Sequence, residues 1–241
     1  MTALFIAWQD THTRLWVPVG RLTRDDGVYR FVYTRGAEEM PSFRPFGRMQ
    51  DLHKVYKSEE LFPIFANRIL AKNRPEYRDY LKWLGLSEAQ YDALEELART
   101  GGLRATDSLE LFPCPEPTAG KNYEVHFFSR GLRHLHEDEP RTGKLEAGER
   151  LYLMQDLQNS CDVMALLLRT GDPITLVGYA PRYYSAEFTQ LINSTGPEDV
   201  KVTVDQVNGD APIQYRLLCR LVAPWPMNFS SCTKKEFEAL A

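Results

Sequence analysis

The chain has 241 residues, of which 43% are hydrophobic and 26% are charged, and its formal net charge is −4. These values are typical of a globular protein with one large or two modest domains, each burying its own core. No apolar run reaches about 18 residues, which argues against a membrane span, and the acidic balance argues against a protein that coats nucleic acid by neutralising many phosphates.

The beginning of the chain and the use of cysteine both indicate a cytoplasmic protein. The first ten residues carry no basic segment, and their apolar stretch is too short for a secretory signal. The four cysteines are widely scattered and form no C-x-x-C pair, so we expect free thiols and neither a metal site nor a cofactor. They are Cys114, Cys161, Cys219 and Cys232.

The first third of the chain predicts short strands over residues 4–8, 16–22 and 28–33, where aromatic and β-branched residues dominate. The sequence Asp25-Asp26-Gly27 predicts the hairpin turn before the third strand. A stretch rich in proline and glycine, residues 36–47, predicts a loop.

Three helices are predicted next. Ser58 is a candidate cap for a helix that runs to about residue 71, Pro75 suits the first turn of a second helix that ends at Gly85, and S-E-A-Q at 87–90 predicts a capping box for a third that ends at Gly101. Tyr91, Leu94, Leu97 and Ala98 share one face of the third helix at helical spacing, which indicates core packing.

Residues 108–112 predict a closing strand, and the proline-rich residues 113–120 predict a linker. Beyond the linker we expect strands over 123–128, 150–156, 163–168, 175–179, 200–207 and 213–222, one helix over about 185–192 and a short terminal helix near 234–240. Several short strands with one helix are typical of a small barrel. The predicted class is therefore α+β: a domain with a small β-sheet and helices over 1–112, a linker over 113–122, an OB-like or SH3-like barrel over 123–226 and a tail over 227–241.

Four short segments of the second half occur in the order found in HIRAN domains. They are G-L-R at 131–133, G-E-R-L-Y-L at 148–153, N-S-C-D-V-M-A at 159–165 and V-G-Y-A-P-R at 177–182. On this ordered set, residues 123–222 resemble a HIRAN domain, a module found in helicase-like transcription factor and as a free-standing bacterial domain. The resemblance implies an OB-like barrel that captures the 3′-terminal nucleotides of single-stranded DNA.

The resemblance also implies roles for six residues. Arg133 would contact phosphate or a base, and His134 takes a position that is often aromatic. Asn159 and Asp162 would lie near the terminal sugar, with Asp162 accepting a hydrogen bond from a free 3′-hydroxyl. The segment with Tyr179 and Arg182 would stack on or contact the strand.

Each of these roles has a structural alternative. Asn159 and Asp162 are residue types that bond their own backbone in turns, which is compatible with a binding role. Tyr179 would otherwise belong to the barrel core and Arg182 would be a solvated loop charge. Cys161 stands where the family has a tyrosine, and His134 replaces a ring better suited to stacking.

The first domain resembles the small N-terminal domain of HipA-type kinases from toxin–antitoxin systems. The segments that carry this resemblance are V-G-R-L at 19–22, Y-R-F-V-Y at 29–33, L-F-P-I-F-A-N-R at 61–68 and the ending around 106–113. In that family the domain makes protein contacts, so the resemblance implies a protein partner for residues 1–112.

No catalytic motif is visible in the sequence. There is no Gly-rich phosphate loop, no kinase catalytic segment, no Walker motif and no G-x-S-x-G elbow, and the His134–Glu137 stretch matches no standard zinc spacing. We therefore predict a non-enzymatic adaptor of bacterial type that engages DNA 3′ ends or repair intermediates while its first domain contacts a protein. The alternative is an antitoxin-like protein-interaction regulator that binds no DNA.

Overall fold

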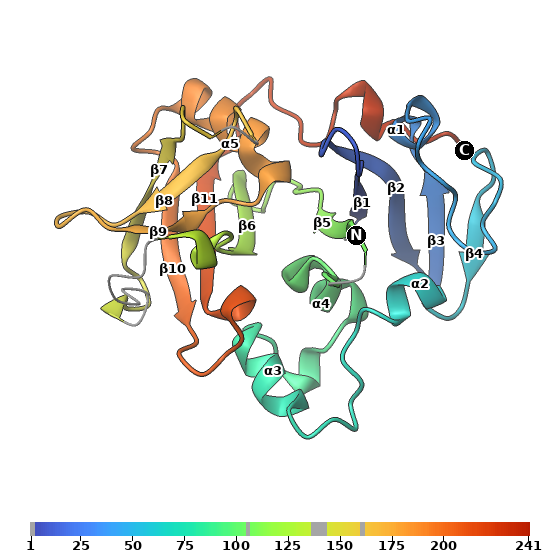
Figure 1. Ribbon diagram of the computed structural model, residues 1–241, viewed down its shortest axis with the longest axis horizontal. Helices are drawn as coiled ribbons and strands as arrows, with labels where there is room; N and C mark the ends of the chain where they lie inside the picture. Colours follow the sequence, from blue (N-terminus) through green and yellow to red (C-terminus); the bar gives the residue numbers. More distant parts are fainter. Residues whose placement is uncertain (1–2, 105–106, 136–143, 160–161) are drawn as a thin grey trace. The chain divides into compact units, whose positions relative to one another are not determined.

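The structure is a computed structural model that describes residues 3–104, 107–135, 144–159 and 162–241 (Figure 1). Its residues form two compact units. Unit 1 comprises Met1–Tyr77, Ala89–Cys114 and Ser230–Ala241, and unit 2 comprises Arg78–Glu88 and Pro115–Phe229. Each unit holds one antiparallel sheet, one of them curled into a barrel-like form, so the predicted α+β class with a barrel is confirmed.

Unit 1 is built on a five-stranded antiparallel sheet in the order β4-β3-β2-β1-β5. Its strands are β1 (Leu4–Gln9), β2 (Trp16–Asp25), β3 (Val28–Tyr33), β4 (Tyr56–Ser58) and β5 (Leu109–Pro113). The predicted turn joins β2 to β3, where Asp25 pairs with Val28 and both intervening residues have positive φ, 46° at Asp26 and 82° at Gly27. Phe31 and Tyr33 lie on the same face of β3 and have no exposed surface, and Val32 on the opposite face is also buried.

The helices of unit 1 correct three of our predictions. They are α1 (Arg35–Glu39), α2 (Pro63–Ala66), the beginning of α3 (Tyr77–Trp83) and α4 (Ala93–Thr100). Ser58 does not cap a helix, because it ends β4 and its hydroxyl accepts the Glu60 amide in a turn. The third helix begins at Ala93 rather than at residue 88, since Asp92 caps it by accepting from the amides of Leu94 and Glu95. The predicted loop over 36–47 also contains most of α1.

Unit 2 is built on a six-stranded antiparallel sheet in the order β6-β11-β10-β7-β8-β9. The strands are β6 (Asn122–Phe128), β7 (Arg150–Gln155), β8 (Leu166–Arg169), β9 (Leu176–Tyr179), β10 (Lys201–Val207) and β11 (Leu217–Pro224). β8 begins at Leu166 rather than at residue 163, because Val163 and Met164 belong to the turn before it. Residues 213–215 form a 3₁₀ turn instead of the start of the last strand.

The two outer strands of this sheet meet, so that it curls into a barrel-like form. Just beyond β6, Arg130 and Tyr179 exchange both backbone hydrogen bonds at 2.9 Å. The buried Ser129 hydroxyl adds a third link, donating to the Val177 carbonyl over 2.6 Å. These bonds satisfy backbone groups that an open sheet edge would expose.

One longer helix, α5 (Arg182–Thr195), packs against the barrel-like sheet. It begins three residues before the predicted 185–192 span and ends three residues after it. Phe188 has no exposed surface and contacts the rings of Tyr123 and Phe127 at centroid distances of 6.2 and 5.7 Å. Apolar contact of this kind explains why the helix holds its place on the sheet.

The last twelve residues, predicted as part of a tail, belong to unit 1. The Phe237 ring lies edge-on to Phe5 at 4.8 Å, and the Leu240 amide donates to the Tyr33 carbonyl. Arg35 forms an ion pair with Glu238 at 2.9 Å. Of the predicted terminal helix only a 3₁₀ turn, Lys235–Phe237, is formed.

Among the described residues, none of the helices is both long and apolar enough to cross a membrane. Within the same ranges, no group of three or more His, Cys, Asp or Glu side chains is placed to hold a metal ion. Among the described residues, Cys114 and Cys219 are free thiols, the Cys232 sulfur lies 3.7 Å from the Ser231 hydroxyl, and Cys161 lies outside the described residues.

Candidate nucleic-acid interface

Four of the predicted site residues belong to one network of contacts: Asn159, Asp162, Tyr179 and Arg182. Asp156, which the sequence analysis did not single out, links them. Asp156 follows β7 and begins the connection to β8. Its Oδ2 accepts a hydrogen bond from the Tyr179 hydroxyl at 2.9 Å and another from the Asn159 side-chain amide at 3.3 Å. The connection between β7 and β8 is thereby attached to the end of β9.

The side chains of Asn159 and Asp162 bond backbone amides in the connection between β7 and β8, as the structural alternative predicts. The Asn159 Oδ1 accepts the Asp162 amide at 2.9 Å, and the Asp162 Oδ1 accepts the Met164 amide at 3.0 Å. Both side chains are thus held in fixed orientations by the backbone. A turn role of this kind leaves other lone pairs of the Asp162 carboxylate for a further donor.

Arg182 is the first residue of α5 and forms an ion pair with Asp162. The Nε atom lies 3.2 Å from the Asp162 Oδ2, and the two side chains are 30% and 16% exposed. Arg182 is therefore not the solvated loop charge of the alternative interpretation. Its guanidinium lowers the electrostatic cost of bringing a phosphate near this carboxylate.

Tyr179 ends β9 and is only partly buried, so it is not a barrel-core residue. Burial, followed by the hydrogen bond to Asp156, raises the pKa of its phenol. The hydroxyl therefore stays protonated at neutral pH and acts as a donor to Asp156. The backbone of Gly131 lies against the ring, since a Cβ built there would be 3.0 Å from the Tyr179 Cδ2.

Arg133 lies in the 3₁₀ turn Leu132–His134 that follows Gly131, and its side chain is exposed. Among the described residues, it makes no hydrogen bond or ion pair through that side chain. The contact between Gly131 and Tyr179 places the turn beside the network, but no contact joins Arg133 to it. The His134 side chain lies outside the described part of the structure.

Two exposed apolar side chains flank the network and were also missed by the sequence analysis. Leu157 is 83% exposed and Val163 is 79% exposed. Both lie in the connection between β7 and β8, on either side of Asn159. The network thus presents carboxylates, the Arg182 guanidinium and a phenol next to exposed apolar surface, and the turn that carries Arg133 lies beside it.

No family model and no curated protein matches the chain. Two solved structures are similar to part of it. The HIRAN domain of human HLTF has a TM-score of 0.31 and 12% identity, covering 44% of this chain and 80% of that one. A structural genomics protein from Lactobacillus plantarum has a TM-score of 0.31 and 16% identity, covering 42% of this chain and 98% of that one. The HipA-type resemblance gains no support from these comparisons and remains a prediction.

Proposed function

We propose that unit 2 binds the 3′ end of single-stranded DNA and does so without catalysing a reaction. The observation that carries the proposal is the network in which Asp156 joins Tyr179 and Asn159, and Asn159 in turn orients Asp162. These hydrogen bonds join the end of β9 to the connection between β7 and β8, so the side chains of Tyr179, Asn159 and Asp162 belong to one network although they lie apart in the sequence.

The chemistry of a strand terminus suits this arrangement. A carboxylate repels the phosphate backbone unless a donor faces it, and a free 3′-hydroxyl is such a donor. Asp162 is held by the Met164 amide and paired with Arg182, so its charge is partly balanced before DNA arrives. The exposed Arg133 is available for a phosphate, and the Tyr179 ring and Leu157 offer surfaces to a base.

The acidic charge of the chain is compatible with a site of this size. Affinity for the interior of a long strand grows with the number of phosphates neutralised. A protein with a net charge of −4 that binds one terminus neutralises few of them. We therefore expect end-specific binding with a weak dependence on salt.

A strand with a free 3′-hydroxyl is expected to bind about ten times more tightly than the same strand with a 3′-phosphate, because one charge-assisted hydrogen bond is lost and a repulsion is added. Fluorescence anisotropy on a 5′-labelled oligonucleotide measures both affinities. Asp162→Asn, which keeps an acceptor for the Met164 amide, should remove the preference. Asp210→Asn, at an exposed position of the same unit, is the matched control. Equal and negligible binding of both strands by the wild-type protein would refute the proposal.

The acidic net charge favours one other candidate, a protein-interaction regulator that binds no DNA. In that case residues 1–112 would contact a protein partner, as they would also do in a DNA-binding adaptor. A complex purified from cells that survives nuclease treatment and is unchanged by Asp162→Ala would favour the regulator.

A further inference from the structure

A second group of side chains in unit 2 consists of one tyrosine and two arginines whose guanidiniums lie near its ring. The Arg169 guanidinium carbon lies 4.8 Å from the centroid of the Tyr152 ring, and that of Arg150 lies 5.4 Å from it. Tyr152 and Arg169 are directly opposite each other in the antiparallel pair of β7 and β8. The sheet register therefore brings Arg169 to the tyrosine, and the period of β7 places Arg150 on the same face.

Among the described residues, no carboxylate forms an ion pair with either guanidinium. Arg150 donates through Nη2 to the backbone carbonyls of Val200 at 3.1 Å and Glu198 at 3.5 Å. Arg169 donates through Nη1 to the Thr170 carbonyl at 2.9 Å. Within the described ranges neither has a carboxylate oxygen within 4.0 Å, whereas Arg182 and Arg220 of the same unit are both paired. The two positive charges beside Tyr152 are thus available to an anion.

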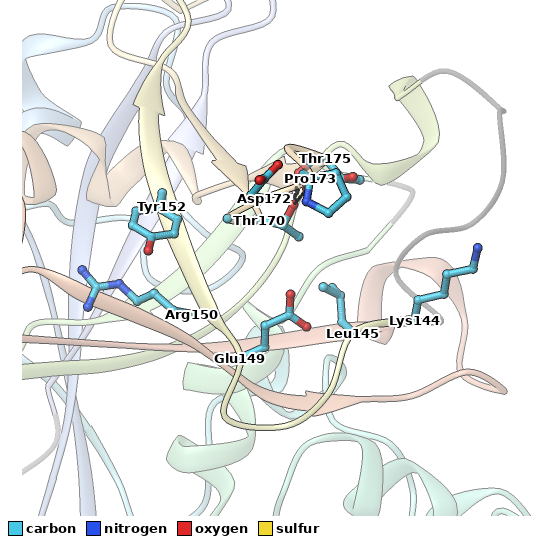
Figure 2. A pocket seen from close by; sticks show the side chains of 10 residues that line it. Lys144, Leu145, Glu149, Arg150, Tyr152, Thr170, Asp172, Pro173 and Thr175 are labelled. Atoms are coloured by element: carbon cyan, nitrogen blue, oxygen red, sulfur yellow. Dashed lines mark hydrogen bonds between the residues drawn. The ribbon is translucent and has the colours of Figure 1, made fainter.

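Two acidic residues, Glu149 and Asp172, lie near Tyr152. A cavity of about 580 Å³ is lined by ten residues that include Tyr152, Glu149 and Asp172. Figure 2 shows the Glu149 carboxylate directed into this cavity, while the Arg150 guanidinium points away from it. The acidic side chain therefore does not neutralise Arg150, and Tyr152 borders both environments.

The tyrosine lies on the same face of the sheet as the candidate 3′-end site. Tyr152 and Met154 alternate along β7, and Asp156 continues the alternation just beyond the strand, where its amide donates to the Ala165 carbonyl. Met154 is opposite Leu167, which is in turn opposite Tyr179. Met154 is 41% exposed, so the surface between the two places is open. Four residues of strand separate Tyr152 from Asp156 by about 13 Å, the length of about four stacked nucleotides.

We propose that this surface, the platform of Arg150, Tyr152 and Arg169, binds the interior of the single strand whose 3′ end occupies the candidate site. A base stacks on Tyr152, and the two guanidiniums contact the phosphates beside it. The strand runs along the outer face of β7 with its 5′ direction toward Tyr152. The inference rests on the proposed function and extends it from the end of the strand to the nucleotides upstream.

The test compares two labelled strands with free 3′-hydroxyls, one of two nucleotides and one of ten. Only the longer strand reaches the platform. Tyr152→Leu is expected to weaken binding of the ten-nucleotide strand about tenfold by loss of stacking and to leave the two-nucleotide strand unchanged. Tyr152→Phe keeps the ring and should bind like the wild type.

A salt titration tests the guanidiniums separately. The double change Arg150→Gln and Arg169→Gln should reduce the slope of log affinity against log salt by about 1.4 for the ten-nucleotide strand, at about 0.7 for each phosphate released from contact. Arg216→Gln is the matched control, because Arg216 also donates only to a backbone carbonyl. Thermal melts of each variant establish that it is folded.

Three outcomes separate the two proposals. Weaker binding of only the longer strand in the platform variants supports both. If the wild type binds both strands and the platform variants do the same, the inference is wrong and the proposed function stands. If the wild type binds neither strand, the proposed function fails and the inference fails with it.

Discussion

Gly178→Ala is expected to destabilise unit 2 by about 3–5 kcal/mol and to abolish 3′-end binding, the largest effect of any single change considered. A Cβ at this position would lie 1.9 Å from the Ser129 hydroxyl oxygen and 2.7 Å from the Arg130 carbonyl oxygen. The backbone φ of 113° adds strain for any residue with a side chain. Both obstacles fall where the ends of the curled sheet meet, next to Tyr179.

The free energy of unfolding of Gly178→Ala and of Gly148→Ala, each measured by denaturant unfolding, separates the cost of backbone strain from the cost of the steric clash. Gly148 also has a positive φ, of 89°, but a Cβ there would meet no atom within 4 Å. The control should therefore lose only the backbone contribution, about 1 kcal/mol. Equal losses in the two variants would show that the contact between β9 and the end of β6 does not close the sheet.

Glu96→Ala is expected to destabilise unit 1 by about 3 kcal/mol, because it removes a buried carboxylate and leaves two half-buried donors without their acceptor. Glu96 has no exposed surface. One of its carboxylate oxygens accepts the Tyr91 hydroxyl at 2.7 Å and the other accepts the Leu70 amide at 3.0 Å. Burial, followed by this hydrogen bond, raises the pKa of Tyr91, which therefore remains a donor at neutral pH.

The adjacent Glu95 provides the control. It forms an ion pair with Arg99 four residues later at 3.0 Å and is 40% exposed. Removing such a pair costs about 0.3–0.5 kcal/mol. Thermal or urea unfolding of Glu96→Ala and Glu95→Ala should therefore differ severalfold in effect, and similar losses would show that Glu96 is not the attachment point of the segment around Leu70.

Most of the strands could be predicted from the sequence because a strand is marked by alternation and turn residues within a few positions of the chain. Alternation and a two-residue turn are enough to define β2 and β3, and the structure places the turn at Asp26 and Gly27. The predicted helix after Ser58 failed because tertiary packing overrides a capping residue. Phe62 and Phe65 contact the Phe31 ring, and only the four residues of α2 are helical there.

The candidate site could be predicted only in part for a related reason. The spacing of Asn159 and Asp162 is visible in the sequence, and the two residues do orient each other. No sequence pattern indicates the role of Asp156, because that role is to accept a hydrogen bond from Tyr179, which is 23 residues away. The platform around Tyr152 could not be predicted from the sequence either. The register between β7 and β8 decides that Arg169 lies opposite Tyr152, and no local pattern shows that register.

The return of residues 230–241 to unit 1 has a consequence for how the protein is made. The strands of unit 1 leave the ribosome first, whereas Phe237 and Leu240, which pack on Phe5 and pair with Tyr33, follow only after all of unit 2. Unit 1 begins to fold before its last element has been synthesised, and unit 2 completes its chain in the meantime. Unit 1 therefore begins to emerge before unit 2 and is completed after it.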